Sequence, residues 1–140
     1  MPYDLHIDPA AGLALVRFSG KLTGPEVMEA MEAVFTHPDW QPAFDVIWDG
    51  SRNRQLVLVP GELERFVALL DRHRSPPGAG RDVVVVVREV DYVVARLYEH
   101  LSRKYSQRLV LCHSLEQAVE KLGLASLPPA LEAAAGGSEE

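Results

Sequence analysis

Residues 81–122 read RDVVVVVREVDYVVARLYEHLSRKYSQRLVLCHSLEQAVEKL, and the pattern of this stretch decides the fold. Its first part holds five consecutive valines, Val83 to Val87. An unbroken β-branched run bounded by charged residues is typical of an inner strand of a parallel sheet, which is apolar on both faces. A second apolar strand follows at 108–112, and Ser114 opens a final helix through a capping-box pattern with Gln117. The stretch therefore predicts a strand–helix–strand–helix unit.

The segment between these two strands changes to helical spacing. Its apolar residues predict the buried stripe of a helix, and they are Val90, Val93, Val94, Leu97, Leu101 and Tyr105. Its polar residues predict the solvated side, and they are Asp91, Arg96, Glu99, Arg103 and Ser106.

The earlier part of the chain predicts a β-hairpin that leads into the sheet. Residues 3–8 alternate apolar and polar side chains, a turn follows, and residues 13–19 form the second strand, which Gly20 ends. Thr23 to Glu26 is a strong helix start, and a third strand covers 44–49. A polar loop at 49–54, an extended piece at 56–59 and a helix over 60–73 come next. We predict an α/β domain over 1–124, with a mixed, mostly parallel five-stranded sheet and about four helices. A flexible tail over 125–140 follows, from which Leu127 and Leu131 could dock loosely.

Composition excludes several classes of protein. The chain has 140 residues and a formal net charge of −6, whereas general nucleic-acid binders are usually basic. Its one cysteine, Cys112, rules out an internal disulfide and fits a reducing compartment. The N-terminal residues show no signal-peptide pattern, and no apolar run approaches the ~20 residues of a membrane span. We expect a cytoplasmic protein that binds no nucleic acid.

Common catalytic motifs fail on inspection. Gly78-Ala79-Gly80 precedes a strand and has Val83 where a dinucleotide fingerprint needs its third glycine. Gly20-Lys21 lacks the rest of a phosphate-binding loop. The chain contains no G-x-S-x-G, H-E-x-x-H or C-x-x-C, and its five histidines share no ligand spacing. We therefore predict no catalytic residue, no metal site and no cofactor.

A positional rule indicates where a ligand would bind. In open parallel sheets, ligands bind beyond the carboxyl ends of the strands. Besides Glu89, His113 and Ser114, those ends and the helix beside them carry our candidate ligand-binding residues, which are Asp49, Ser51, Arg52, Arg54, Arg88, Tyr92 and Arg96. Arginines near helix N-termini could form an anion-binding rim. The alternative is that Arg52 and Arg54 only solvate a loop, while Arg88 pairs with Glu89 or Asp91.

Several short strings resemble one family. They are Gly20-Lys21-Leu22-Thr23, Trp48-Asp49-Gly50-Ser51, Arg81 to Val87, Tyr92 to Glu99 and Ser114 to Leu122. In this order they resemble the SpoIIAA-like group of small bacterial proteins, relatives of the STAS domains that are also described as STAS/SEC14-like. The resemblance covers residues 3–122. It implies a βα superhelix with strands laid in sequence and helices mainly on one face.

The resemblance also implies partner switching through a phosphorylated serine or threonine at the start of the helix after the third strand. Asp49-Gly50-Ser51 matches the turn of that pattern, but Val59-Pro60-Gly61 has no hydroxyl group, and Ser51 is displaced into the loop. The sequence therefore predicts a regulatory, protein-interaction module that lacks the usual phosphoacceptor.

The group is further associated with apolar or lipid-like ligands and with membrane surfaces. If helices cover one sheet face only, Val83 to Val87 leaves apolar side chains on the other, and each forgoes roughly 1.5 kcal/mol of burial. A dimer partner, a moving helix, a ligand or the tail should then cover that face.

Three functions follow from these observations. The first is a non-catalytic module that acts through a protein partner or as a homodimer. The second is a carrier or sensor of a small amphipathic or lipid-like anion, at the membrane surface or in solution, with the ligand head at Arg52, Arg54 or Arg88 and its tail against the 90–105 helix. The third, an enzyme, would require Asp49, Ser51 and His113 to meet in space. An apolar pocket between the 49–54 loop and the start of the 90–105 helix would favour the second.

Overall fold

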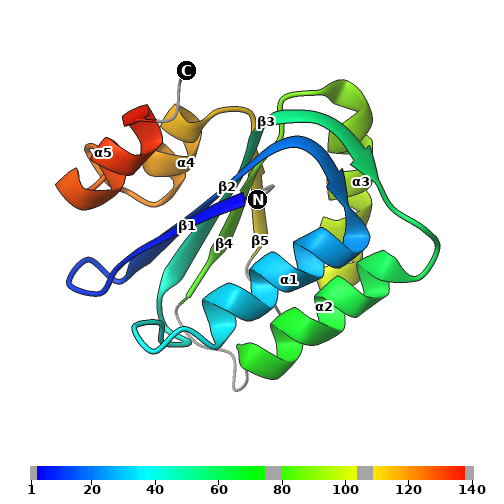
Figure 1. Ribbon diagram of the computed structural model, residues 1–140, viewed down its shortest axis with the longest axis horizontal. Helices are drawn as coiled ribbons and strands as arrows, with labels where there is room; N and C mark the ends of the chain where they lie inside the picture. Colours follow the sequence, from blue (N-terminus) through cyan, green and yellow to red (C-terminus); the bar gives the residue numbers. More distant parts are fainter. Residues whose placement is uncertain (1–2, 75–79, 104–108, 138–140) are drawn as a thin grey trace.

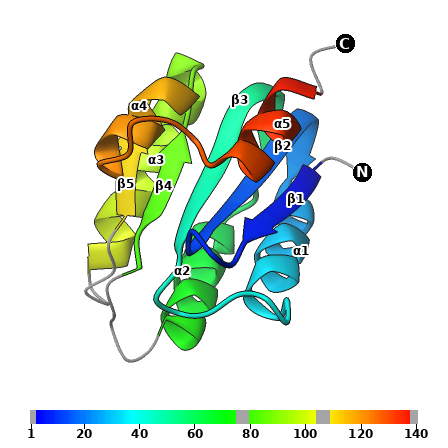
Figure 2. The ribbon, with the colours of Figure 1, turned by 90° about the vertical axis from the view of Figure 1, so that its left-hand side faces the viewer.

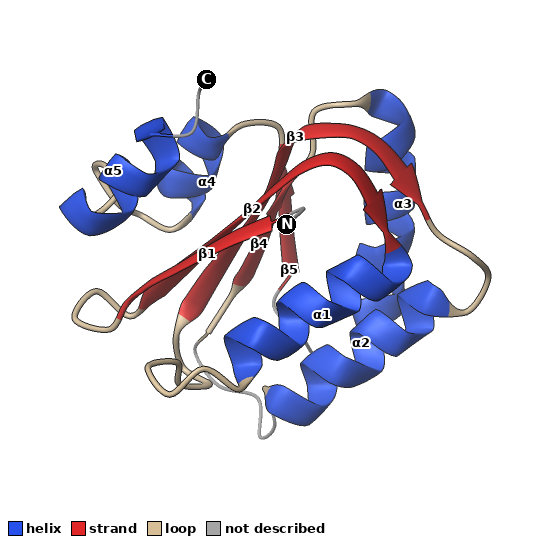
Figure 3. Ribbon diagram, in the orientation of Figure 1, coloured by secondary structure: helices blue, strands red, loops and turns tan. Residues whose placement is uncertain are grey.

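The structure is a computed structural model that describes residues 3–74, 80–103 and 109–137. Its described residues form five strands and five helices around one sheet (Figures 1 and 3). In chain order these are β1 (Tyr3–Asp8), β2 (Leu13–Thr23), α1 (Gly24–Phe35), β3 (Asp45–Val57), α2 (Glu62–His73), β4 (Asp82–Val85), α3 (Glu89–Ser102), β5 (Leu109–Cys112), α4 (Leu115–Lys121) and α5 (Pro129–Gly137).

The sheet has the strand order β1-β2-β3-β4-β5, so the strands lie side by side in chain order. β1 pairs antiparallel with β2, and the other neighbours pair parallel. β4 lies between β3 and β5, and Val83 and Val85 are fully buried. These findings confirm the predicted mixed sheet and the inner valine strand, although the strand ends at Val85 and Val87 is exposed.

Helices cover both faces of the sheet. Helices α1, α2 and α3 lie on one face, and α4 and α5 lie on the other (Figure 2). Side chains alternate between the two faces along each strand. Ala14 and Val16 of β2 therefore join the core under α1 to α3, whereas Leu13 and Leu15 join the core under α4 and α5.

The second face is the first difference from the prediction. Residues 125–140 were expected to be a flexible tail, but Pro129–Gly137 forms α5, and Leu127 and Leu131 are buried against the sheet. The physical reason is the apolar second face of the sheet, on which α4 packs against β4 and β5 and α5 packs against β1 (Figure 2). The chain's own helices thus cover this face, α4 over the valine strand and α5 over the hairpin.

The second difference concerns β2 and β3, which continue past the expected ends. Gly20 does not end a strand, and residues 49–54 are not a loop, because Ser19 pairs with Arg52 and Thr23 pairs with Val57. Register shifts interrupt this pairing, and Gly20 has a φ of 72° in the left-handed region that glycine tolerates. Figure 3 shows the two strands bending together out of the sheet, over the face that carries α1 and α3. We call this curved segment, β2 19–23 with β3 52–57, the ribbon.

The third difference concerns the side of α3 that faces the sheet. Asp91, Ala95 and Ser102 are buried, whereas Val90, Val93 and Leu97 are 60%, 70% and 51% exposed. The predicted stripe is therefore largely on the solvent side. Small side chains at 95 and 102 favour close approach of the helix, and Tyr98 reaches across to Phe66 with ring centroids 6.2 Å apart. The helix is described to Ser102, and the expected end at Tyr105 lies outside the described residues.

Candidate ligand site between the ribbon and helix α3

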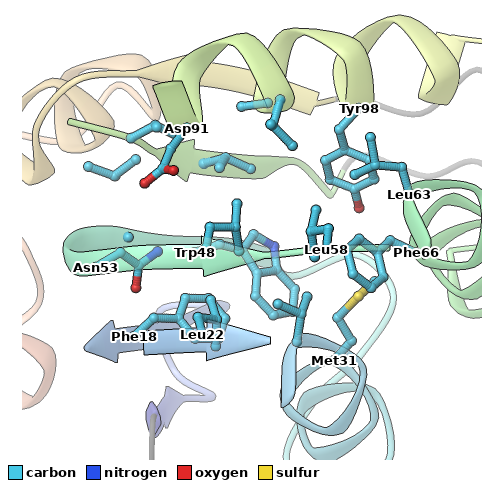
Figure 4. Close-up of a pocket in the computed structure, with 18 residues that line it drawn as sticks. Phe18, Leu22, Met31, Trp48, Asn53, Leu58, Leu63, Phe66, Asp91 and Tyr98 are labelled. Carbon is cyan, nitrogen blue, oxygen red and sulfur yellow. The ribbon is translucent and has the colours of Figure 1, made fainter. Parts of the chain in front are cut away.

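A cavity of about 120 Å³ lies between the ribbon, helices α1 and α2, and the inner side of α3 (Figure 4). It is partly enclosed and mostly apolar. Its walls include Phe18 and Leu22 of β2, Trp48 and Leu58, Met31 of α1, and Phe66 and Leu63 of α2. The cavity is therefore a gap in the core under α1 to α3.

The geometry of two elements explains this gap. The ribbon curves out of the sheet plane at its bulges, so its apolar side chains form an overhang. On the facing wall, α3 presents Ala95, a small side chain, and Asp91, a carboxylate, where a larger apolar residue would fill the space. Rotation of α3 toward its small residues and curvature of the ribbon together leave the cavity open.

One end of the cavity is polar. Asp91 on α3 and Asn53 on the ribbon lie on opposite walls at this end (Figure 4). The Asp91 side chain is 9% exposed, and its nearest charged partner among the described residues is Arg88, with an N–O distance of 3.8 Å. The Oδ1 atom of Asn53 is buried and has no hydrogen-bond partner among the described residues. A nearly buried carboxylate and a buried amide oxygen without a partner thus lie at this end of a mostly apolar space.

The other polar group in the lining is the Tyr98 hydroxyl, which points between α3 and the Trp48 region (Figure 4). Burial raises the pKa of Tyr98 well above its usual value, and the nearby Asp82 carboxylate raises it further. Asp82 itself accepts a hydrogen bond of 2.9 Å from the Trp48 indole and pairs with Arg74. This end of the cavity is held by a satisfied network and keeps a neutral phenol.

The predicted site residues divide between the two faces of the sheet. Asp49 forms a buried ion pair of 3.1 Å with Arg17 and accepts a hydrogen bond from the Ser51 backbone. Because Asp49 alternates with Trp48, its side chain lies on the α4 and α5 face, away from the cavity.

The arginines and Tyr92 are placed around the N-terminal part of α3. Arg88 donates to the Arg54 carbonyl and lies near Asp91, so the structure brings residues 54 and 88 together. Arg96 pairs with Glu99 on the exposed side, and Tyr92 stacks on His113 with centroids 4.6 Å apart. Arg52 also takes part in an interaction. None of these side chains lines the cavity.

Sequence reasoning missed the residues that do line its polar parts, which are Asn53, Asp91 and Tyr98. Asn53 fell within the polar loop predicted at 49–54. The candidate ligand-binding residues chosen from that loop included its neighbours Arg52 and Arg54 but not Asn53. Asp91 was assigned to the solvated side of its helix. A carboxylate one position from two apolar residues, Val90 and Tyr92, carries no sequence signal of burial.

The start of α2, where the resemblance implies a phosphorylated serine or threonine, carries the carboxylate of Glu62. Gly61 precedes α2 with a φ of 91°, and Glu62 accepts a hydrogen bond of 2.8 Å from the Val59 backbone. The Glu62 carboxyl packs directly on Gly24, where an added Cβ would lie 2.1 Å from it. A carboxylate of the protein's own therefore lies between the segment that precedes α2 and the start of α1.

Other chemistry finds no support in the described part of the chain. Asp49 accepts a hydrogen bond from the Ser51 backbone, whereas the His113 ring lies 3.3 Å from the Val86 carbonyl and against Tyr92. No group of three or more His, Cys, Asp or Glu side chains among the described residues could hold a metal ion. No helix in the described ranges is long and apolar enough to cross a membrane.

The strand order, the opening hairpin and the alternating helices define an α/β domain with a SpoIIAA-like fold. A solved structure of the anti-sigma factor antagonist SpoIIAA in its unphosphorylated form has the same fold, with a TM-score of 0.54 and 14% sequence identity. The superposition covers 86% of this chain and 97% of that one. Comparison with known sequence families found no match. Comparison with curated proteins also found none.

Proposed function

We propose that this protein is a non-catalytic regulatory module of the cytoplasm that binds a protein partner, or a second copy of itself, through the outer face of α3. The observation that carries this proposal is the exposure of Val90, Val93 and Leu97 in one row on that helix. Positions i, i+3 and i+7 lie on one side of a helix. Exposed apolar rows of this kind mark interaction sites more often than isolated apolar side chains do.

The fold likeness supports the same reading. SpoIIAA is by its name an antagonist of an anti-sigma factor, so in that protein this fold serves regulation. In this chain, residues 59–61 contain no hydroxyl group, and the Glu62 carboxylate accepts a hydrogen bond from the Val59 backbone just before α2. We therefore propose recognition that no phosphorylation at the start of α2 controls.

The test replaces part of the row with charge. The double variant Val90→Glu/Val93→Glu should reduce retention of the partner from a lysate of the source organism at least tenfold, because buried unpaired carboxylates oppose docking. If the partner is a second copy, light scattering should show the dimer of the wild type becoming a monomer.

Leu124→Glu is the matched control, because Leu124 is also partly exposed but follows α4 on the other face of the sheet. Its retention should equal that of the wild type. A wild-type protein that is strictly monomeric and retains no partner contradicts the proposal, and so does a double variant that binds like the wild type.

A second candidate function is a sensor or carrier of a small molecule, and the cavity favours it specifically. An apolar space beside the exposed row would let an occupant alter the position of α3. Binding of a small apolar compound that shifts the Trp48 indole signal in NMR spectra would support this function, since Trp48 lines the cavity. A spectrum that no such compound changes would remove it.

A further inference from the structure

We infer that the cavity accepts a small apolar molecule whose head group donates a hydrogen bond, an amine or a hydroxyl, and that it rejects carboxylates. The donor would bind Asp91 and Asn53 at the polar end, and the apolar body would lie against Trp48 and Ala95. This inference rests on the second candidate function and names the ligand class for it.

The size of the cavity limits the ligand. A volume of about 120 Å³ is close to that of apolar protein cavities that hold a single benzene ring. A long acyl chain would need a considerably larger space to lie wholly inside. The part of the ligand that enters the cavity is therefore on the order of one ring or a short branched chain.

Asp91 sets the preferred charge of the head group. An ionised carboxylate accepts hydrogen bonds and donates none. Among the described residues it forms no hydrogen bond, and the Arg88 nitrogen at 3.8 Å is beyond hydrogen-bond distance and belongs to a side chain that is 39% exposed. Arg88 also donates to the Arg54 carbonyl, so its charge is shared. A donor on the ligand would meet an acceptor that is nearly buried and under-satisfied.

Asn53 adds the second acceptor. Its buried Oδ1 has no partner among the described residues, and leaving a buried oxygen unsatisfied costs free energy that a ligand donor would recover. An amine or hydroxyl carries the proton that both oxygens lack. A carboxylate would instead face Asp91 at short range in a poorly solvated space, where repulsion is strong.

This chemistry revises the ligand that the sequence predicted. The anion was expected to meet Arg52, Arg54 or Arg88, and none of the three side chains lines the cavity. The polar end of the cavity is built from oxygen acceptors, and its complement is a donor.

The test uses four probes with one ring and different head groups, which are benzylamine, benzyl alcohol, benzoate and toluene. Binding is followed at neutral pH through the Trp48 indole N–H signal and the Ala95 methyl signal. Benzylamine and benzyl alcohol should bind, with benzoate at least tenfold weaker than benzylamine. Toluene has no polar head group, so its affinity measures only how well the ring fits the apolar space.

Two variants locate the effect. Asp91→Asn should weaken benzylamine at least fivefold and leave toluene unchanged, because it removes the charge and keeps the shape. Glu89→Gln makes the same charge change in the same turn of α3, at an exposed position outside the lining, and should leave all four affinities unchanged. Ala95→Leu should abolish binding of every probe by filling the cavity. Circular dichroism shows which variants fold, so a failure of Asp91→Asn to fold leaves Ala95→Leu and the probe series as the test.

The outcomes separate the two proposals. If toluene binds and benzoate binds as well as benzylamine, the head-group inference is overturned and the small-molecule sensor stands. If none of the four probes binds the wild type at millimolar concentration, water alone occupies the polar end and both are overturned. Benzylamine binding that Asp91→Asn does not weaken also overturns the inference.

Discussion

Two arginines at the N-terminal end of β4 show how burial decides the importance of an ion pair. Arg74 pairs with Asp82 at 3.0 Å, and Arg81 pairs with Asp45 at 3.1 Å. The first pair is almost buried, with side chains 7% and 2% exposed, whereas the second is 30% and 22% exposed. Arg74 also donates to the carbonyls of Pro42 and Phe44, at 2.7 and 2.6 Å. Arg74 therefore ties the start of β3 to the start of β4.

We expect Arg74→Met to lower the free energy of unfolding by about 3–5 kcal/mol, because the Asp82 charge would be left buried without its partner. Arg81→Met, the matched control at nearly the same bond length, should cost no more than about 1 kcal/mol because water replaces the lost partner. Urea denaturation of both variants at neutral pH measures the difference. Equal losses would contradict the role given to burial.

Helix α5 is the element that makes the fold complete without a partner on its second sheet face. Its Leu131 is fully buried and belongs, with Leu127, to the same core as Leu13 and Leu15. Helix α5 packs on β1 and α4 packs on β4, so together they cover the face that the sequence left open. With this face of the sheet covered, the outer face of α3 remains as an exposed apolar surface.

Leu131→Ala should lower the free energy of unfolding by about 2–4 kcal/mol, as expected for a large-to-small change in a packed core. Leu124→Ala is the control, because Leu124 is 38% exposed, and it should cost less than about 1 kcal/mol. Thermal and urea unfolding measure both. A Leu131→Ala protein as stable as the wild type would mean that α5 does not pack on the sheet in solution. That result would agree with the flexible tail predicted from the sequence.

The elements also show what a sequence can predict and where it stops. The valine run identified β4 as an inner strand, and Thr23 with Glu26 identified the start of α1, because both signals are local. The side of α3 that meets the sheet is not a local property. The helix carries apolar residues on two sides, and packing chose the side with Ala95 and Ser102.

The candidate site was also predictable only where the signal is local to the sequence. The sequence analysis named an apolar pocket between residues 49–54 and the start of the 90–105 helix as the observation that would favour ligand binding, and a cavity lies between the ribbon and α3. The side chains that line it depend on the pleat of β3 beyond its bulges, which turns Asn53 inward and Asp49 to the other face. A register shift of one residue exchanges the two faces of a strand, so composition alone could not assign them.

At the scale of the whole molecule, the central strands belong to both cores at once. Along β3, Val46 and Trp48 point under α1 to α3, while Ile47 points under α4 and α5. Both helical layers pack on the same strands. If one layer detached from the sheet, it would expose strands on which the other layer also packs. The two cores should therefore unfold together.

This coupling can be measured because Trp40 and Trp48 both belong to the core under α1 to α3, opposite α5. In Leu131→Ala, the change is made on the α5 side, and the tryptophan fluorescence reports from the other side. We expect the urea midpoints from fluorescence and from far-UV circular dichroism to fall by the same amount, as in a two-state transition. A fluorescence midpoint that stays at its wild-type value while the dichroism midpoint falls would show two independent layers. With coupled layers, any ligand that binds the cavity must also stabilise α5 against unfolding, because ligand binding to the native state stabilises the whole cooperative unit.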